Sequence, residues 1–127
     1  DRCTVRRIID GDTIDVDCAG RRERVRLLQI DTPERGQPGY REATAALRSL
    51  IGGSEVTLEY AQPGRPTRGR YGRLLAYVFV DGINANVEMV REGWTPYWTK
   101  YGRSRFEPDF LAAERQATLR RAQLTRR

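Results

Sequence analysis

The sequence of 127 residues contains no histidine. This absence excludes a Ser-His-Asp triad and every site in which an imidazole acts as general base or metal ligand. Cysteine is also scarce, since Cys3 and Cys18 are the only two. Two cysteines are too few for a zinc site, and their spacing is not that of metal ligands. The sequence therefore excludes imidazole catalysis and a cysteine-based metal centre.

Lysine is nearly absent, because Lys100 is the only one among 23 basic residues. These basic residues outnumber 17 acidic ones and give a net charge of +6, which favours polyanionic partners. Arginine presents a planar fork of donors that matches a pair of phosphate oxygens. A GC-rich genome that prefers arginine codons explains the same bias equally well, so composition alone leaves both interpretations open.

Long apolar runs are absent as well. No stretch is long enough to span a membrane, and no signal peptide is recognisable, so no membrane association is expected. A chain of 127 residues that is 39% hydrophobic can bury a core without help from disulfides. We expect a single domain over residues 1–127, present as a monomer.

The two cysteines lie on either side of Asp10-Gly11, which is a strong hairpin-turn signal. A two-residue loop there sets Cys3 opposite Cys18 and predicts a disulfide between them. The same register predicts two further cross-strand pairs: Val5 with Val16, and Arg6 with Asp15. A disulfide indicates folding in an oxidising compartment, and hence a secreted or otherwise extracytoplasmic protein. Two free buried thiols would instead fit a cytoplasmic protein.

Apolar periodicity divides the rest of the chain into short elements. Alternation predicts strands at 3–9, 13–18, 23–30, 56–60 and 74–80. Helical spacing predicts a helix over 43–51, a short helix capped by Asn86, and a last helix from about Pro108 that frays over 120–127. Five strands interrupted by one helix and followed by two more predict an α+β fold, a five-stranded OB-type β-barrel with three helices.

Two segments carry charged side chains suited to phosphodiester chemistry. Residues 26–34 place an arginine on an apolar strand and end with two carboxylates around a proline, while residues 70–73 present two arginines at a glycine-containing turn. Carboxylates can hold a hard cation, and arginine forks can bind phosphate. The two segments together indicate a nuclease.

The same segments belong to a larger pattern. Four motifs, in order and with nearly the same spacing, resemble the staphylococcal nuclease (thermonuclease) family: Asp10-Gly11-Asp12-Thr13, residues 26–34, Arg70-Tyr71-Gly72-Arg73-Leu74-Leu75-Ala76-Tyr77, and residues 86–93. Each motif alone is a weak signal, whereas four in order are a strong one. The resemblance implies a five-stranded OB barrel with three helices that binds one Ca²⁺ ion and hydrolyses DNA and RNA to 3′-phosphates.

The resemblance also implies a metal site. Asp12 and Asp31 would be the carboxylate ligands of calcium, and the backbone carbonyl of Thr32 would be a third protein ligand. An oxygen-only site with few carboxylates suits Ca²⁺ or Mg²⁺ and repels soft metals. The residues do not choose between the two ions, so the assignment of calcium comes from the resemblance.

Three further residues receive catalytic roles from the resemblance. Glu34 would hold the attacking water, directly or through the metal's shell. A neighbouring cation and arginines make its carboxylate a weak base, so its role as water-positioning group and its role as general base are both kept as interpretations. Arg26 and Arg73 would bind the scissile phosphate from two sides and stabilise the charge added in the transition state.

Substrate-binding residues are expected beside them, namely Arg70, Tyr71 and Tyr101. Tyr101 aligns with one of two tyrosines that contact the nucleotide in the family. The position two residues earlier is Thr99, so Tyr97 or Trp98 is the candidate substitute for the second tyrosine.

Each charged residue also has a structural interpretation. Asp12 fits turn chemistry, Arg26 could pair with a buried carboxylate, and Arg73 could be one more solvated loop charge. Two rival functions follow: a catalytically silent nucleic-acid-binding OB module, and a structural or protein-interaction barrel. Silent repeats of the family lack the aspartates and arginines that this chain retains, which favours the enzyme.

Overall fold

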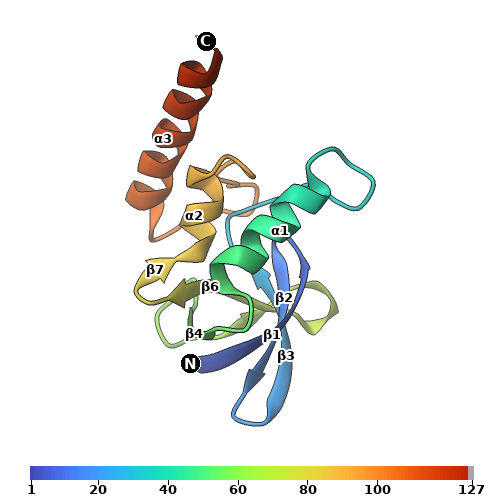
Figure 1. Ribbon diagram of the computed structural model, residues 1–127. Coiled ribbons are helices and arrows are strands. Elements are labelled where there is room, and N and C mark those ends of the chain that lie inside the picture. Colours follow the sequence, from blue (N-terminus) through green and yellow to red (C-terminus); the bar gives the residue numbers. More distant parts are fainter. Residues whose placement is uncertain (126–127) are drawn as a thin grey trace.

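A closed β-barrel of five long strands forms the body of the molecule (Figure 1). The strands pair antiparallel in the order β3-β2-β1-β4-β6, and a parallel pairing of β3 with β6 closes the barrel. The strands are β1 (Arg2–Asp10), β2 (Thr13–Cys18), β3 (Arg21–Leu27), β4 (Glu55–Glu59) and β6 (Leu74–Val80). The structure, a computed structural model, describes residues 1–125.

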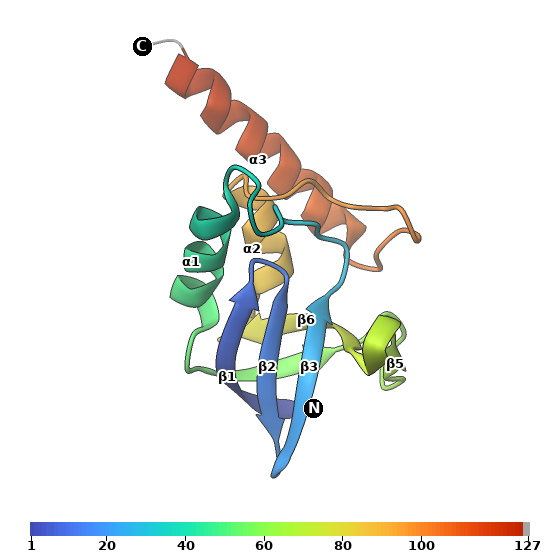
Figure 2. The same cartoon turned by 90° about the vertical axis from the view of Figure 1, so that its right-hand side faces the viewer.

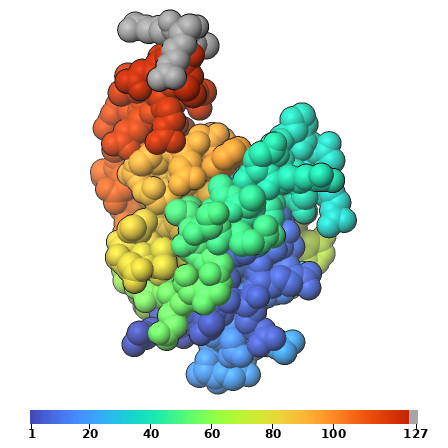
Figure 3. Space-filling model, in the orientation of Figure 1, coloured from blue at the N-terminus to red at the C-terminus, as the bar shows by residue number. Residues whose placement is uncertain are grey.

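Three helices cover one end of the barrel. They are α1 (Tyr40–Ile51), α2 (Ala85–Arg91) and α3 (Glu107–Thr125). Helix α1 packs on β1 and α2, while α2 packs on β6 and α3. Helix α3 runs past α2 and projects from the body, as the red segment in Figure 3 shows. The predicted α+β fold, a five-stranded OB-type barrel with three helices, is confirmed.

Minor elements complete the fold. The two-residue strands β5 (Thr67–Arg68) and β7 (Ile83–Asn84) pair with β6, and a 3₁₀ turn, η1 (Arg70–Gly72), precedes β6. The β1–β2 turn and the end of β3 face the helices (Figure 2). This arrangement brings the charged motifs to one end of the barrel. None of the helices in the described part of the chain has the length and apolar character needed to cross a membrane.

The core follows the predicted periodicity. Alternate strand residues fill the barrel: Val5, Ile14, Val16, Val25, Leu27, Leu58, Ala76 and Val78. Helix α1 buries Ala43, Leu47 and Ile51 at helical spacing. Each valine, leucine or isoleucine among them contributes about 1.5–3 kcal/mol when it leaves water, so these positions anchor the barrel and its first helix.

The first hairpin contains the predicted disulfide between Cys3 and Cys18, whose Cα atoms lie 4.3 Å apart. The predicted turn is wrong, however, because Asp10 pairs with Thr13 and the two-residue turn is therefore residues 11–12. Two irregularities in β1 compensate, one between Val5 and Arg7 and one between Ile8 and Asp10. Each inserts an extra residue into β1, as a β-bulge does, so the cysteines still meet.

Of the two predicted cross-strand pairs of this hairpin, one is confirmed and one is wrong. Val5 does pair with Val16, beyond both irregularities. Asp15 pairs with Arg7 and not with Arg6, because the first irregularity shifts the register between these positions. Arg6 instead approaches the carboxylate of Asp17 at 3.8 Å.

Several predicted boundaries also need correction. The third strand ends at Leu27, before Gln29 adopts a left-handed φ of 63°. The short helix is capped by Asn84, whose side chain accepts the amide of Val87, and not by Asn86. Helix α3 begins one residue before Pro108 and continues through Thr125, so fraying from residue 120 is wrong. Residues 126–127 of that prediction lie outside the described residues.

Candidate active site

A cavity of about 810 Å³ opens where the charged motifs meet. The β1–β2 turn, the end of β3, the segment that follows it, the η1 turn and residues 98–101 form its walls. Most of the predicted site residues line it: Asp12, Arg26, Asp31, Thr32, Glu34, Arg70, Arg73 and Tyr101. Tyr71 is not part of the lining, and its side chain is directed to solvent with 91% exposure.

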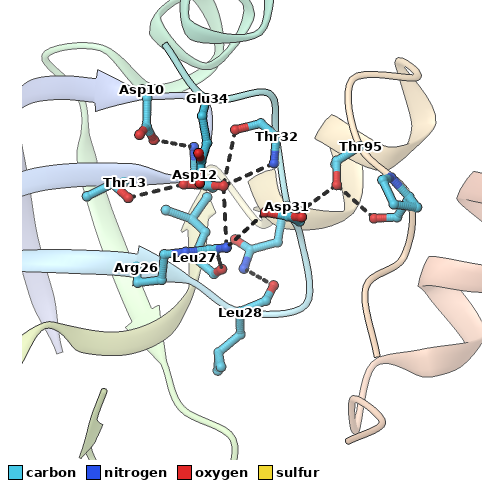
Figure 4. Close-up of polar contacts among 12 residues, drawn as sticks. Asp10, Asp12, Thr13, Arg26, Leu27, Leu28, Asp31, Thr32, Glu34 and Thr95 are labelled. Atoms are coloured by element: carbon cyan, nitrogen blue, oxygen red, sulfur yellow. Dashed lines mark hydrogen bonds and ion pairs between the residues drawn. The ribbon is translucent and has the colours of Figure 1, made fainter. Parts of the chain in front are cut away.

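Asp12 is a buried carboxylate with fixed hydrogen-bond partners (Figure 4). Its Oδ2 atom accepts the backbone amide of Thr32 at 3.0 Å and the Thr32 hydroxyl at 3.1 Å. Its Oδ1 atom accepts the hydroxyl of Thr13 at 3.1 Å. Hydrogen bonds to both oxygens fix the orientation of the carboxylate and the direction of its remaining lone pairs.

Arg26 lies between the two predicted metal ligands. Its Nη2 atom is 3.4 Å from Oδ2 of Asp12 and 3.7 Å from Oδ1 of Asp31. Its Nη1 atom donates to the carbonyl of Leu27 at 2.6 Å, and the guanidinium lies 5.6 Å from the ring centre of Trp98. The pairing with a buried carboxylate, foreseen as a structural interpretation, is thus present, and the guanidinium still lines the cavity.

Asp31 and Glu34 follow β3 on an extended segment. The Asp31 amide donates to the hydroxyl of Thr95 at 2.8 Å, which anchors the backbone, while the Asp31 side chain remains 51% exposed. The Glu34 amide donates to the side chain of Gln37 at 2.7 Å. Both carboxylates therefore sit on a held backbone with side chains open to solvent and to ligands.

Arg70 and Arg73 flank the η1 turn on the opposite wall. The Nε atom of Arg73 donates to the carbonyl of Arg70 at 3.2 Å, and its guanidinium lies 5.9 Å from the ring centre of Tyr71. Among the residues that the structure describes, neither arginine pairs with a carboxylate. Both guanidinium groups are therefore available to an anion that enters the cavity.

An aromatic wall, formed by Trp98 and Tyr101, closes a third side. The two rings meet edge to face with centres 5.4 Å apart, and Tyr101 is 78% exposed. Tyr97, the other candidate substitute for the missing tyrosine, stacks on Phe110 and lies outside the cavity lining. Trp98 is thus the aromatic residue that accompanies Tyr101.

Comparison with known proteins agrees with this geometry. A family model described as staphylococcal nuclease homologue matches residues 24–125. The chain belongs to this family. Asp10 and Asp12 precede the matched residues, so their place in the site comes from the structure.

Curated relatives extend the comparison. The chain is 42% identical over 96 residues to an uncharacterized endonuclease of Escherichia coli, covering 75% of this chain and 60% of the relative. It is 38% identical over 96 residues to endonuclease YncB of Bacillus subtilis, covering 71% and 44%. It is 39% identical over 95 residues to a thermonuclease of Staphylococcus intermedius, covering 70% and 55%. The chain spans about half the length of these curated relatives.

Sequence reasoning missed Asp10, which also lines the cavity of this staphylococcal nuclease homologue. Its Oδ1 atom accepts the amide of Asp12 at 3.0 Å. Burial first, and the negative charge of Asp12 second, raise the pKa of Asp10 to about 6. Its place two residues before Asp12 was the available signal, because an aspartate side chain can accept the backbone amide two residues on and so turn toward that residue. Its interpretation as a turn residue concealed that signal.

Two further residues, which sequence analysis did not assign to the site, hold the backbone of the site in place. The hydroxyl of Thr95 bonds the Asp31 backbone, as described above. The fully buried amide of Asn86 accepts from Val78 and donates to the carbonyls of Leu28 and Ala76, which joins β6 to the segment after β3. Asn86 was expected at a helix cap, and only the fold reveals its bridging role.

The family implies a calcium ion, and the donor set fits a hard cation. The acidic groups that line the cavity, which include Asp12, Asp31 and Glu34, offer only oxygen atoms, as Ca²⁺ and Mg²⁺ require. Within the described residues, no three acidic, histidine or cysteine side chains converge on one point. Fewer protein ligands than a full coordination shell leave room for water and for substrate oxygens.

Proposed function

We propose that this chain is a calcium-dependent nuclease that hydrolyses the phosphodiester bonds of DNA and RNA and leaves 3′-phosphates. One observation carries the proposal. The acidic side chains of Asp12, Asp31 and Glu34 share a single cavity with the guanidinium groups of Arg26 and Arg73. Carboxylates beside a pair of arginines supply both the cation site and the phosphate site that the reaction needs.

The arginines bind and stabilise the phosphate. Arg26 projects from β3 and Arg73 precedes β6, and these two strands are direct neighbours at the barrel closure. Each guanidinium presents paired donors to phosphate oxygens. The two groups stabilise the negative charge that builds up on those oxygens as water attacks the phosphorus and the bond to the 5′-oxygen breaks.

The carboxylates hold the cation and the water. Asp12 and Asp31, together with the carbonyl of Thr32, would hold Ca²⁺, which neutralises phosphate charge and helps to position water when it is bound. Glu34 accepts a hydrogen bond from the attacking water and takes its proton. Glu34 is suited to this role because it is exposed at the mouth of the same cavity.

The proposal extends to the setting in which the enzyme works. We infer an extracytoplasmic location, since the Cys3–Cys18 disulfide requires oxidising conditions to form. We further propose that a monomer is sufficient for activity, because one chain supplies both the acidic groups and the arginines that the reaction needs.

A cleavage assay with a matched acid variant tests the proposal. Purified protein is incubated with plasmid DNA and with RNA, in Ca²⁺ or in chelator, and product ends are typed by their sensitivity to a 3′-phosphatase. Wild type should cut both substrates in Ca²⁺ only. Asp31→Asn should abolish cutting, whereas Asp81→Asn removes the same charge from an exposed turn away from the cavity and should not.

The alternatives give different results. Binding of nucleic acid without cleavage in any divalent cation would indicate the catalytically silent OB module. Neither binding nor cleavage at physiological salt would indicate a structural or protein-interaction barrel. Cleavage that resists chelator would contradict the metal-dependent mechanism.

A further inference from the structure

Gln29 joins the end of the β3 segment to the aromatic wall of the cavity. We propose that Gln29 is a positioning residue that holds Tyr101 in place for substrate and so sets the affinity for nucleic acid. The inference rests on the proposed function, because it concerns the substrate of that same site. We call the hydrogen bonds from Gln29 to Trp98 and Gly102 the Gln29 clamp.

The two hydrogen bonds of the Gln29 clamp reach the two ends of one turn, residues 98–102. On the near side, the Trp98 amide donates to the Gln29 carbonyl at 2.8 Å. On the far side, Nε2 of Gln29 donates to the Gly102 carbonyl at 3.2 Å. The Gly102 amide closes the turn by donating to the Thr99 carbonyl at 3.0 Å. Tyr101 lies inside this turn, and its exposed ring meets only the edge of Trp98 and the ammonium group of Lys100 among the ring contacts of the described residues.

The Gln29 side chain is itself fixed from the core. Its Oε1 atom accepts the Tyr77 hydroxyl at 2.6 Å, and the Tyr77 hydroxyl in turn accepts from Ser104 at 2.8 Å. Tyr77 is 1% exposed. Because a buried donor occupies the amide oxygen, the amide nitrogen must face Gly102. The clamp therefore has one orientation.

The backbone conformation of Gln29 allows the contribution of its side chain to be measured separately from that of its backbone. Its φ of 63° lies in the left-handed region, which glycine adopts freely and glutamine adopts at a cost. A glycine at this position would keep the backbone path and the bond from Trp98 while losing only the side-chain bonds. Strain of this kind persists where surrounding contacts hold the residue in place, and here the side chain supplies them.

Holding the turn in advance lowers the entropy that substrate binding must remove. Loss of the side-chain bond to Gly102 frees Tyr101, so affinity falls. The Arg26 guanidinium lies over the Trp98 ring. Trp98 is bonded to Gln29 through backbone atoms only, so this bond remains when the Gln29 side chain is replaced. The clamp should therefore act on KM and leave kcat almost unchanged.

Two variants test this assignment. Gln29→Gly removes the side chain without backbone strain, and Gln29→Glu keeps the acceptor for Tyr77 but cannot donate to Gly102 when ionised. Each should raise KM, and weaken binding of a single-stranded oligonucleotide in chelator, about five-fold, with kcat within about two-fold of wild type. Hydrogen exchange of the Gly102 amide should become about five-fold faster, which requires no activity.

A double-mutant cycle decides whether Gln29 acts through Tyr101. In a Tyr101→Ala background, Gln29→Gly, which adds no charge to the cavity, should cause no further loss of affinity. An equal loss in both backgrounds, or unchanged affinity and unchanged Gly102 exchange in both single variants, would overturn the proposal. Wild-type protein that neither binds nor cuts nucleic acid would instead overturn the proposed function and, with it, the affinity role of Gln29.

Discussion

Thr32 packs directly on Gly11, so closely that a β-carbon at position 11 would lie 2.7 Å from the Thr32 hydroxyl oxygen. Gly11→Ala must therefore displace Thr32 and break its two bonds to Asp12. We expect the free energy of unfolding to fall by about 1–3 kcal/mol. The free energy of calcium binding should fall by a larger fraction of its own value. Denaturant titration and calcium titration measure the two effects. Unchanged calcium affinity in a folded variant would contradict this role of Thr32.

Calcium should stabilise the native protein. A ligand at one hundred times its Kd that binds only the folded state adds about 2.7 kcal/mol, or roughly 8 °C in Tm for a chain of this size. Scanning calorimetry with and without Ca²⁺ measures the shift. Asp12→Ala should remove it and abolish cleavage, while Asp81→Asn should retain both. A shift of equal size in Asp12→Ala would place the ion elsewhere.

Lysine cannot replace the site arginines. Arg26→Lys and Arg73→Lys retain the positive charge but lose the paired donors aimed at the transition state. We expect kcat to fall about a hundred-fold, with oligonucleotide affinity in chelator changing less than about five-fold. Arg22→Lys, an exposed position outside the cavity, serves as the control and should match wild type in both measurements. Equal rates in all three variants would refute the phosphate-binding role.

The disulfide should contribute stability without taking part in catalysis. Closing a loop of 15 residues stabilises by roughly 3 kcal/mol through the unfolded chain. Reduction, or a Cys3→Ser and Cys18→Ser double variant, should lower the denaturation midpoint while calcium-dependent cleavage persists at low denaturant. Mass spectrometry of unreduced, alkylated protein should find no added alkyl group. Two additions would disprove the pairing and remove the basis for an extracytoplasmic location.

One surface ion pair should be visible in the pH dependence of stability. Arg24 donates to both oxygens of Asp15, at 2.8 and 3.1 Å, and this bond holds the Asp15 pKa below its ordinary value of 3.8. The pair therefore stabilises the fold above pH 3.8, and its contribution disappears as pH falls through the lower folded-state pKa. Because Arg24 is half exposed, Asp15→Asn should cost only about 0.5 kcal/mol at pH 7 and progressively less as the pH falls below 3.8. Denaturant titration of wild type and of Asp15→Asn from pH 7 downward measures whether the difference between their unfolding free energies shrinks as the pH falls.

Local sequence patterns were enough to find the barrel and most of its site. Strands β1, β2, β4 and β6 and helix α1 were predicted because alternation and helical spacing are properties of neighbouring residues. The cavity residues were found because four motifs come in a recognisable order. These signals identify which residues form the elements and the site. They do not say which residues contact one another in the folded chain.

The errors concern relationships that depend on three-dimensional contacts. The irregularities in β1 leave no mark in a pattern of period two, so Arg6 was paired with Asp15 in place of Arg7. Asn86 satisfies every rule for a helix cap, yet the fold buries it as a bridge between two chain segments. The left-handed backbone of Gln29 is invisible in sequence because glutamine rarely adopts it.

The parallel pairing that closes the barrel also determines when the two cavity arginines come together. Val25 pairs with Leu74 and Arg26 with Leu75, and this pairing sets Arg26 beside the strand that follows Arg73. In a newly made chain in which this pairing has not formed, Arg26 and Arg73 lie on separate segments that move independently. The arrangement of the two guanidinium groups in one cavity therefore depends on this parallel pairing and on neither segment by itself.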